Sequence, residues 1–395
     1  MPHLRPRDAL PLLKKKLSFS PVVSIQGARQ TGKSTLARDV LKDQYYLTLD
    51  RPALLNQAKT STEVFLEEAR SQADGKLVVI DEAQKAPPLF DLIKYFVDRD
   101  KKPGQFLLLG STEFSKEVLI RESLTGRLSR LRLFPMTCGE TLQKGFRELD
   151  RNGLFPGKAR VSRSEFVKFL GHGGYPGIFA VRDPVERTQR WDDLVTLTCE
   201  RDALLFPKMK GDSDLCRRIL ALSATLEEST QAEFSAALRV SAKKIATQIK
   251  ILSQLFMLHA IRPHPLGTGK IRYYLNDAGL AAFLGASFER RLETAAYLEQ
   301  FARRAYSVRG CPELFYYRTT KGSVIHLLTQ ESPTVIHAQK IIHGEKSDQR
   351  EFEVLIALGK KAEKQGIKAH LSALAATEGT LAREKIKINL WETLG

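Results

Sequence analysis

The chain has 395 residues, 43% of them hydrophobic, so it can build two or three packed domains and is too apolar to be disordered. Lys and Arg number 62 against 45 Asp and Glu, and the net charge of +17 favours polyanions, with nucleic acid first and an anionic membrane second. No apolar run suits a signal peptide or a membrane span, and the four cysteines are too scattered for a metal site. We expect a cytoplasmic protein.

Residues 21–136 alternate short apolar runs with helical patterns. The apolar runs lie at 21–26, 44–50, 76–81, 105–111 and 129–136. Runs of this kind, without regular polar alternation, are typical of strands buried on both faces. This part of the chain therefore predicts a parallel α/β sheet, and we place a first domain at 1–145.

The first run leads into "GARQTGKS", residues 27–34, which matches the G-x-x-x-x-G-K-[ST] pattern in full. The glycines let backbone N–H groups converge on phosphate oxygens at the positive end of the following helix. We expect Lys33 to reach the β- and γ-phosphates of ATP and the Ser34 hydroxyl to ligate Mg²⁺. The predicted nucleotide-binding residues are Gly27, Ala28, Arg29, Gln30, Thr31, Gly32, Lys33, Ser34 and Thr35.

Two further strands end in polar residues suited to hydrolysis. "LVVIDEAQ" ends in Asp81, placed to hold Mg²⁺ through water, and Glu82, the natural base for an attacking water. "QFLLLGS" ends in Ser111, whose hydroxyl is expected to orient that water, with ordinary strand-end capping as the alternative. Because the carboxyl ends of parallel strands meet at one edge of a sheet, these residues are expected beside the phosphate loop.

Five segments occur in a recognisable order: "GARQTGKSTL", "VIDEAQKAPPLFDLIK", "LLLGSTEF", "ESLTGRLSRLRLFPMTCGE" and "GGYPGIF". They resemble AAA-type, archaeal-ATPase-like P-loop proteins with a C-terminal domain of unknown function. The resemblance implies an additional-strand fold in which the strand before Ser111 lies between the other two motif strands. It also draws attention to Arg127, either as an arginine finger in a homo-oligomer, as a phosphate ligand in cis, or as an ordinary surface residue.

Residues 151–160 predict a polar linker, and a second domain at 160–285 is mostly helical. Thr230 with Glu233 predicts a capping box that starts one helix, and Ser241 caps a second helix after a short turn. The "HPLGTGKIRYY" hairpin follows, so the order is that of a winged helix. The predicted DNA-contacting residues on the second helix are Lys243, Lys244, Thr247, Gln248 and Lys250. Protein docking is the alternative use of the same surface.

The third domain, 286–395, has the helix, three strands, helix, strand order of a restriction-endonuclease-like fold. Glu299 suits the helix acid of such a site, but His326, His337 and Gln339 stand where Asp, an acid and Lys are needed. These side chains do not form a magnesium site, because Mg²⁺ requires oxygen ligands. A zinc site at His326 and His337 lacks an obvious third ligand. We therefore expect an inactive module.

The sequence as a whole predicts an ATPase with Lys33 and Glu82 as catalytic residues, whose nucleotide state controls a DNA-contacting winged helix. One alternative is a nucleotide-switched regulator with negligible turnover that binds a protein partner. The other is a metal-dependent nuclease, which the residues of the third domain disfavour.

Overall fold

A computed structural model describes residues 4–113, 124–206, 209–344, 349–377, 379–381 and 386–395 of the chain. Contacts divide the chain into two compact units. The first unit consists of Met1–Pro135, Tyr175–Gly177 and Gln254–Met257. The second unit consists of Met136–Gly174, Ile178–Ser253 and Leu258–Gly395.

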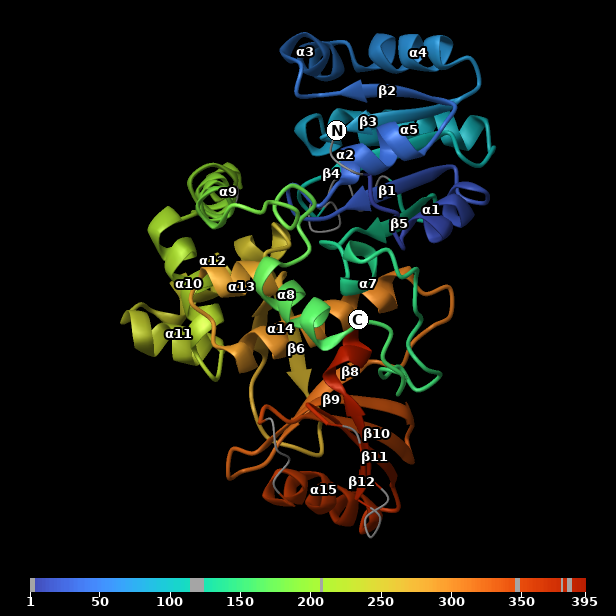
Figure 1. Cartoon of the computed structure of the whole chain (residues 1–395). Coiled ribbons are helices and arrows are strands. Elements are labelled where there is room, and N and C mark those ends of the chain that lie inside the picture. The colour runs from blue at the N-terminus through green and yellow to red at the C-terminus, as the bar shows by residue number, and fades with distance from the viewer. Residues whose placement is uncertain (1–3, 114–123, 207–208, 345–348, 378, 382–385) are drawn as a thin grey trace. The chain divides into compact units, whose positions relative to one another are not determined.

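The first unit is built on a five-stranded sheet with the order β2–β3–β4–β1–β5 (Figure 1). All neighbouring strands are parallel. The strands are β1 (Val22–Gln26), β2 (Gln44–Thr48), β3 (Leu77–Asp81), β4 (Phe106–Gly110) and β5 (Leu128–Arg132). Every residue of β1 and β4 is buried, which explains their uninterrupted apolar sequence. The predicted parallel sheet is confirmed, and β4 lies between β3 and β1 as the resemblance implied.

The helices of the first unit cover this sheet and begin at sequence signals. They are α1 (Leu10–Leu17), α2 (Lys33–Thr35), which continues as a π-helical turn over Leu36–Val40, α3 (Pro52–Thr60), α4 (Thr62–Ala73) and α5 (Pro88–Arg99). Proline at the first position of α3 and α5 suits a helix start, since its missing N–H has no partner there. Phe65 and Leu66 of α4 and Phe90 and Ile93 of α5 form the apolar core with β3 and β4.

The second unit begins with a helical region and also contains a larger sheet. Its helices are α7 (Cys138–Thr141), α8 (Arg163–His172), α9 (Pro184–Thr196), α10 (Ser213–Thr225), α11 (Gln231–Leu238), α12 (Ala242–Gln254, whose last residue belongs to the first unit), α13 (Ala278–Phe283), α14 (Phe288–Tyr306) and α15 (Glu353–Glu363). The Thr230 hydroxyl accepts from Glu233 N–H at the start of α11, and Ser241 Oγ accepts from Lys244 N–H in α12. Both predicted helix starts are confirmed.

The sheet of the second unit has eight strands in the order β12–β13–β11–β10–β9–β8–β6–β7. They are β6 (Leu258–Pro263), β7 (Arg272–Leu275), β8 (Leu314–Arg318), β9 (Val324–Ser332), β10 (Val335–Ile341), β11 (Lys368–Ala375), β12 (Gly379–Leu381) and β13 (Ile386–Leu390). Because β6 pairs with β8, strands from the expected second and third domains share one sheet. The expected domain boundaries stay a prediction.

Packing in the second unit corrects one local expectation. The expected linker at 151–160 is not a free linker, because Leu154 and Phe155 are buried in an apolar cluster with Phe166 and Trp391.

In the part of the chain that the structure describes, no helix combines the length and apolar character needed to cross a bilayer.

Candidate functional site

The loop at 27–34 turns the chain sharply between β1 and α2. A Cβ on Gly27 would lie 2.1 Å from the backbone oxygen of Leu133, so only glycine fits there. Gly32 has φ of 93°, in the left-handed region that glycine adopts without strain. The Thr31 hydroxyl donates to Ala28 O over 2.9 Å and closes the loop from inside. Of the other expected loop residues, Ala28 is buried, Arg29 and Thr35 are half-buried, and Gln30 is exposed.

The Lys33 ammonium group is buried and folded over this loop. Its Nζ donates to Gly27 O over 2.9 Å and to Ala28 O over 2.8 Å. A phosphate oxygen would be a charged acceptor, and charge-assisted hydrogen bonds are roughly twice as strong as neutral ones. The loop therefore holds the lysine where a phosphate group can compete for it.

Asp81, the last residue of β3, lies beside the loop. The Ser34 hydroxyl donates to Asp81 Oδ2 over 2.6 Å, and the Glu82 backbone N–H donates to Oδ1 over 2.9 Å. The Tyr46 hydroxyl also donates to Oδ2. Burial and this hydrogen bond raise the pKa of the Tyr46 phenol, which keeps it a donor at neutral pH. A hydroxyl and a carboxylate side by side are the hard oxygen donors that suit a magnesium ion.

Glu82 and Ser111 also come together, as the sequence predicted. Ser111 Oγ donates to Glu82 Oε2 over 3.1 Å. Gln84 Nε2 donates to the same carboxylate oxygen and lies 3.2 Å from Ser111 Oγ. Gln84 was missed in the sequence, although it is only two residues beyond the acid. The amide and the hydroxyl together fix the direction of the Glu82 carboxylate.

Arg7 is a second residue that sequence reasoning missed. Its guanidinium is buried and donates to Thr31 O over 2.6 Å and to Phe134 O over 2.7 Å. It therefore ties the phosphate loop to the segment that follows β5. The sequence contains no signal for this contact, because Arg7 and Phe134 are 127 positions apart.

Residues 19–142 match the family described as "AAA domain". The N-terminal part of the chain is an AAA-like P-loop domain. Residues 163–291 match a domain of unknown function. Two uncharacterized mycobacterial proteins, Mb2031c of Mycobacterium bovis and Rv2008c of Mycobacterium tuberculosis, are each 27% identical over 339 residues, which covers 82% of this chain and 71% of theirs. Among solved structures, the Walker-type ATPase PABY2304 of Pyrococcus abyssi gives a TM-score of 0.47 at 16% identity, covering 71% of this chain and 98% of that one.

Arg127 lies away from the phosphate loop of its own AAA domain. It precedes Leu128, which pairs with Val22 at the start of β1, whereas the loop follows Gln26 at the other end of that strand. Its guanidinium binds Asp98, with Nη2 and Oδ2 3.0 Å apart. The expectation that Arg127 binds phosphate in cis is therefore wrong, because strand register places it at the opposite edge of the sheet. A role in trans stays a prediction.

The residues predicted to contact DNA differ in what their side chains do. Lys243 and Lys250 are exposed, and Thr247 is half-buried and donates to Lys243 O. Lys244 forms an ion pair with Asp212 over 2.8 Å. Spacings of four and three residues predict one apolar stripe at Ile245, Ile249, Leu252 and Phe256. All four are buried, and Phe256 lies just beyond the end of α12.

Gln248 does not belong to the exposed face of α12. Its side chain is only 1% exposed, and it donates to Lys210 O and accepts from Asp212 N–H, each over 3.0 Å. The prediction that Gln248 reads bases is therefore wrong. It fastens the 210–212 segment to the helix, and this segment and α12 line a hollow of about 570 Å³.

In the second unit, Glu299 is a structural residue. It is fully buried, accepts from Cys138 N–H over 2.6 Å and forms an ion pair with Arg303 over 3.1 Å. His337 binds Glu331 over 2.7 Å and stacks on His370, so the structure does not pair it with His326. Gln339 is buried as well. Glu299, His326 and His337 of the considered nuclease site therefore each have partners of their own.

His326 instead lies with Glu293 of α14 and His343, and one ligand atom from each is within 4.8 Å of the others. The Ile341 N–H donates to His326 Nδ1 over 3.0 Å. Burial lowers the pKa of His326 to about 4, so the ring is neutral and its proton lies on Nε2, 3.2 Å from Glu293 Oε1. A metal ion would need the lone pair of Nε2. In this arrangement the His326 ring serves as a hydrogen-bond partner of Glu293 and of the Ile341 N–H.

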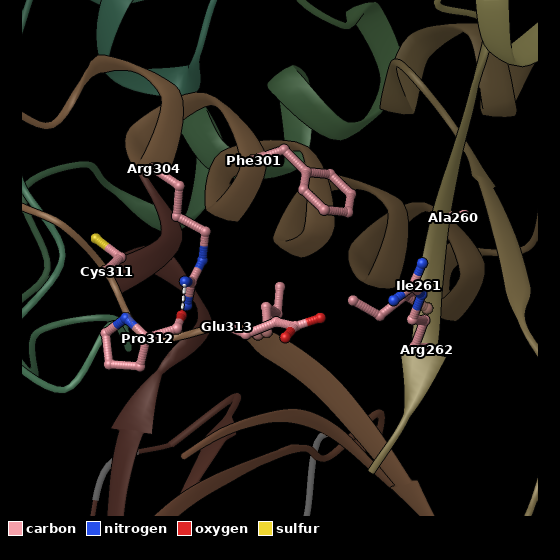
Figure 2. A pocket seen from close by; sticks show the side chains of 9 residues that line it. Ala260, Ile261, Arg262, Phe301, Arg304, Cys311, Pro312 and Glu313 are labelled. Atoms are coloured by element: carbon pink, nitrogen blue, oxygen red, sulfur yellow. Dashed lines mark hydrogen bonds between the residues drawn. The ribbon is translucent and has the colours of Figure 1, made fainter. Parts of the chain in front are cut away.

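Figure 2 shows another hollow of the second unit, of about 320 Å³, between β6, α14 and residues 311–314. Arg304 on its wall donates to Pro312 O and Gly153 O and to Gln300 Oε1. Burial lowers the pKa of this guanidinium. Because the donors of Arg304 already bind the 311–314 segment and its neighbours, they are not available to a ligand in the hollow, and we assign the hollow no function.

Proposed function

We propose that the protein is a magnesium-dependent ATPase whose nucleotide state controls a DNA-contacting winged helix. The contact between Ser34 Oγ and Asp81 Oδ2, 2.6 Å long, carries the ATPase part of the proposal. It joins the end of the phosphate loop to the end of β3, where a cation bound to ATP has to lie. Bound magnesium would neutralise negative charge on the β- and γ-phosphate oxygens.

The residues of the site have separate roles in this proposal. Lys33 exchanges its loop carbonyls for phosphate oxygens, and Ser34 and Asp81 would hold a magnesium ion bound to the nucleotide. Glu82 accepts a proton from the attacking water. Ser111, hydrogen-bonded to Glu82, orients that water from the neighbouring strand.

The DNA part of the proposal rests on element order and on exposed charge. The elements of this region follow one another in the order of a winged helix. They are a helix, a short bridge between Thr230 and Arg272, two further helices and the β6–β7 hairpin. Lys243 and Lys250 are seven positions apart on the exposed side of α12. They suit contacts to phosphates, which supply affinity without base specificity. The burial of Gln248 removes one candidate for base reading.

A second candidate function is a nucleotide-switched regulator that turns over ATP negligibly and docks a protein partner. The observation that favours it is the double hydrogen bond on Glu82, because Gln84 and Ser111 both occupy Oε2 of the proposed base. A nuclease is disfavoured, since the Glu299 carboxylate is bound to Arg303 and to the Cys138 N–H.

The test is steady-state ATPase turnover of the full chain with duplex DNA, single-stranded DNA and RNA at several salt concentrations. Lys33→Ala should lose nucleotide binding, and Glu82→Gln should bind ATP without hydrolysing it, because it keeps the shape and loses the base. A Glu82→Gln variant that turns over like the natural protein contradicts the assigned base. Turnover below detection, with ATP still changing the affinity for DNA or protein, supports the switch.

A further inference from the structure

The carboxylate of Asp81 is held by more donors than the sequence motif supplies. Ser34 and Tyr46 both donate to Oδ2, and the backbone N–H of Glu82 donates to Oδ1. A carboxylate oxygen has two lone-pair directions, so the two hydroxyl groups fill both acceptor positions of Oδ2. Tyr46 is the member of this set that lies outside the loop and the acidic strand end.

Strand register explains how Tyr46 reaches Asp81. Tyr46 of the edge strand β2 is paired with Val79 of β3, and Asp81 lies two residues further along on the same face. An aromatic side chain can span such a diagonal between neighbouring strands. Tyr45 alternates to the other face, where it packs against the apolar core.

We propose that Tyr46 is a positioning residue that orients Asp81 for magnesium. This inference rests on the proposed magnesium-dependent ATPase. The Ser34 hydroxyl has one proton and two lone pairs, so it can offer its oxygen to a cation and still donate to Oδ2. The Tyr46 hydroxyl is a second side-chain donor to that oxygen, from outside the phosphate loop, and it would help to hold the carboxylate in one orientation when a magnesium ion is bound.

Replacement of Tyr46 by Phe removes this donor and keeps the ring. The carboxylate then keeps one side-chain donor in place of two and rotates more freely, so part of the binding energy of a cation would be lost in fixing Asp81 again. Nucleotide binding without magnesium does not use Asp81 and should not change. Tyr45→Phe is the matched control, since it makes the same chemical change one residue away on a half-buried tyrosine.

The experiment measures the affinity of the full-length protein for a fluorescent ADP analogue during a magnesium titration, with the natural sequence, Tyr46→Phe and Tyr45→Phe. We expect Tyr46→Phe to require about tenfold more magnesium for half of the affinity gain, the equivalent of one lost hydrogen bond to a charged group. Nucleotide affinity in EDTA and the behaviour of Tyr45→Phe should match the natural protein.

Two results would overturn the inference alone. One is an unchanged magnesium requirement in Tyr46→Phe, and the other is an equal shift in Tyr45→Phe. If magnesium has no effect on nucleotide affinity in the natural protein, the proposed function itself fails, and the role of Tyr46 fails with it.

Discussion

Arg7 offers the sharpest test of how the phosphate loop is held. Its guanidinium donates to Thr31 O and Phe134 O over 2.6 and 2.7 Å, and the side chain is 7% exposed. Arg7→Ala leaves both carbonyl oxygens without this donor. Hydrogen bonds from a charged donor contribute about 1.5–3 kcal/mol each, so we expect a loss of about 3 kcal/mol or more in the free energy that keeps the loop closed.

The assay is hydrogen exchange of peptides covering residues 27–35, together with affinity for labelled ATP. A loss of about 3 kcal/mol corresponds to an increase of about two orders of magnitude in loop opening and therefore in exchange rate. ATP affinity should fall as well, because the binding energy must then also order the loop. Arg7→Lys should give about half of the effect, since one ammonium group cannot reproduce the planar fork of donors.

Arg51→Ala is the matched control, because Arg51 is an exposed arginine of the same unit. It should leave exchange and affinity unchanged. If the loop peptides of Arg7→Ala exchange at the rate of the natural protein, the contacts of Arg7 do not hold the loop closed, and the reasoning fails.

Three further predictions concern the second unit. Burial raises the pKa of Asp277 to about 6. The contribution of this carboxyl to stability is therefore fully present below its usual pKa near 4 and is lost as the pH rises through 6. Urea unfolding between pH 4 and 7 should show this dependence in the natural protein and lose it in Asp277→Asn. Lys243→Ala with Lys250→Ala should reduce the salt slope of log DNA affinity by about 1.8. Lys360→Ala with Lys364→Ala, the same charge change at the C-terminal end of α15, should not change it. Glu299→Ala should lower the unfolding free energy by about 3–5 kcal/mol, because Arg303 would be left buried without its partner. No DNA cleavage should occur with Mg²⁺ or Mn²⁺ before or after the change. Cleavage that Glu299→Ala abolishes would show that the strand alignment is wrong.

Much of the phosphate site is predictable from the sequence because its causes are local. The left-handed Gly32 and the crowding at Gly27 belong to a turn of a few residues, and the pattern that encodes it is contiguous. Asp81, Glu82 and Ser111 could be placed beside that turn because parallel strands end at one edge of a sheet. The buried stripe of α12 follows from helical periodicity in the same way.

Only the tertiary structure decided which side chains and backbone groups from distant parts of the chain contact one another. Gln248 lies three residues after Ile245 and four before Leu252, beside the buried stripe, and its amide binds the backbone of segment 210–212. Arg127 lies near the motifs in sequence, but strand register places it at the far edge of the sheet. His326 faces Glu293, and Tyr46 and Arg7 reach the phosphate site from a strand and a segment without any motif. Side-chain pairing of this kind depends on which surfaces come into contact when the chain folds. Residue type and local periodicity do not specify these contacts.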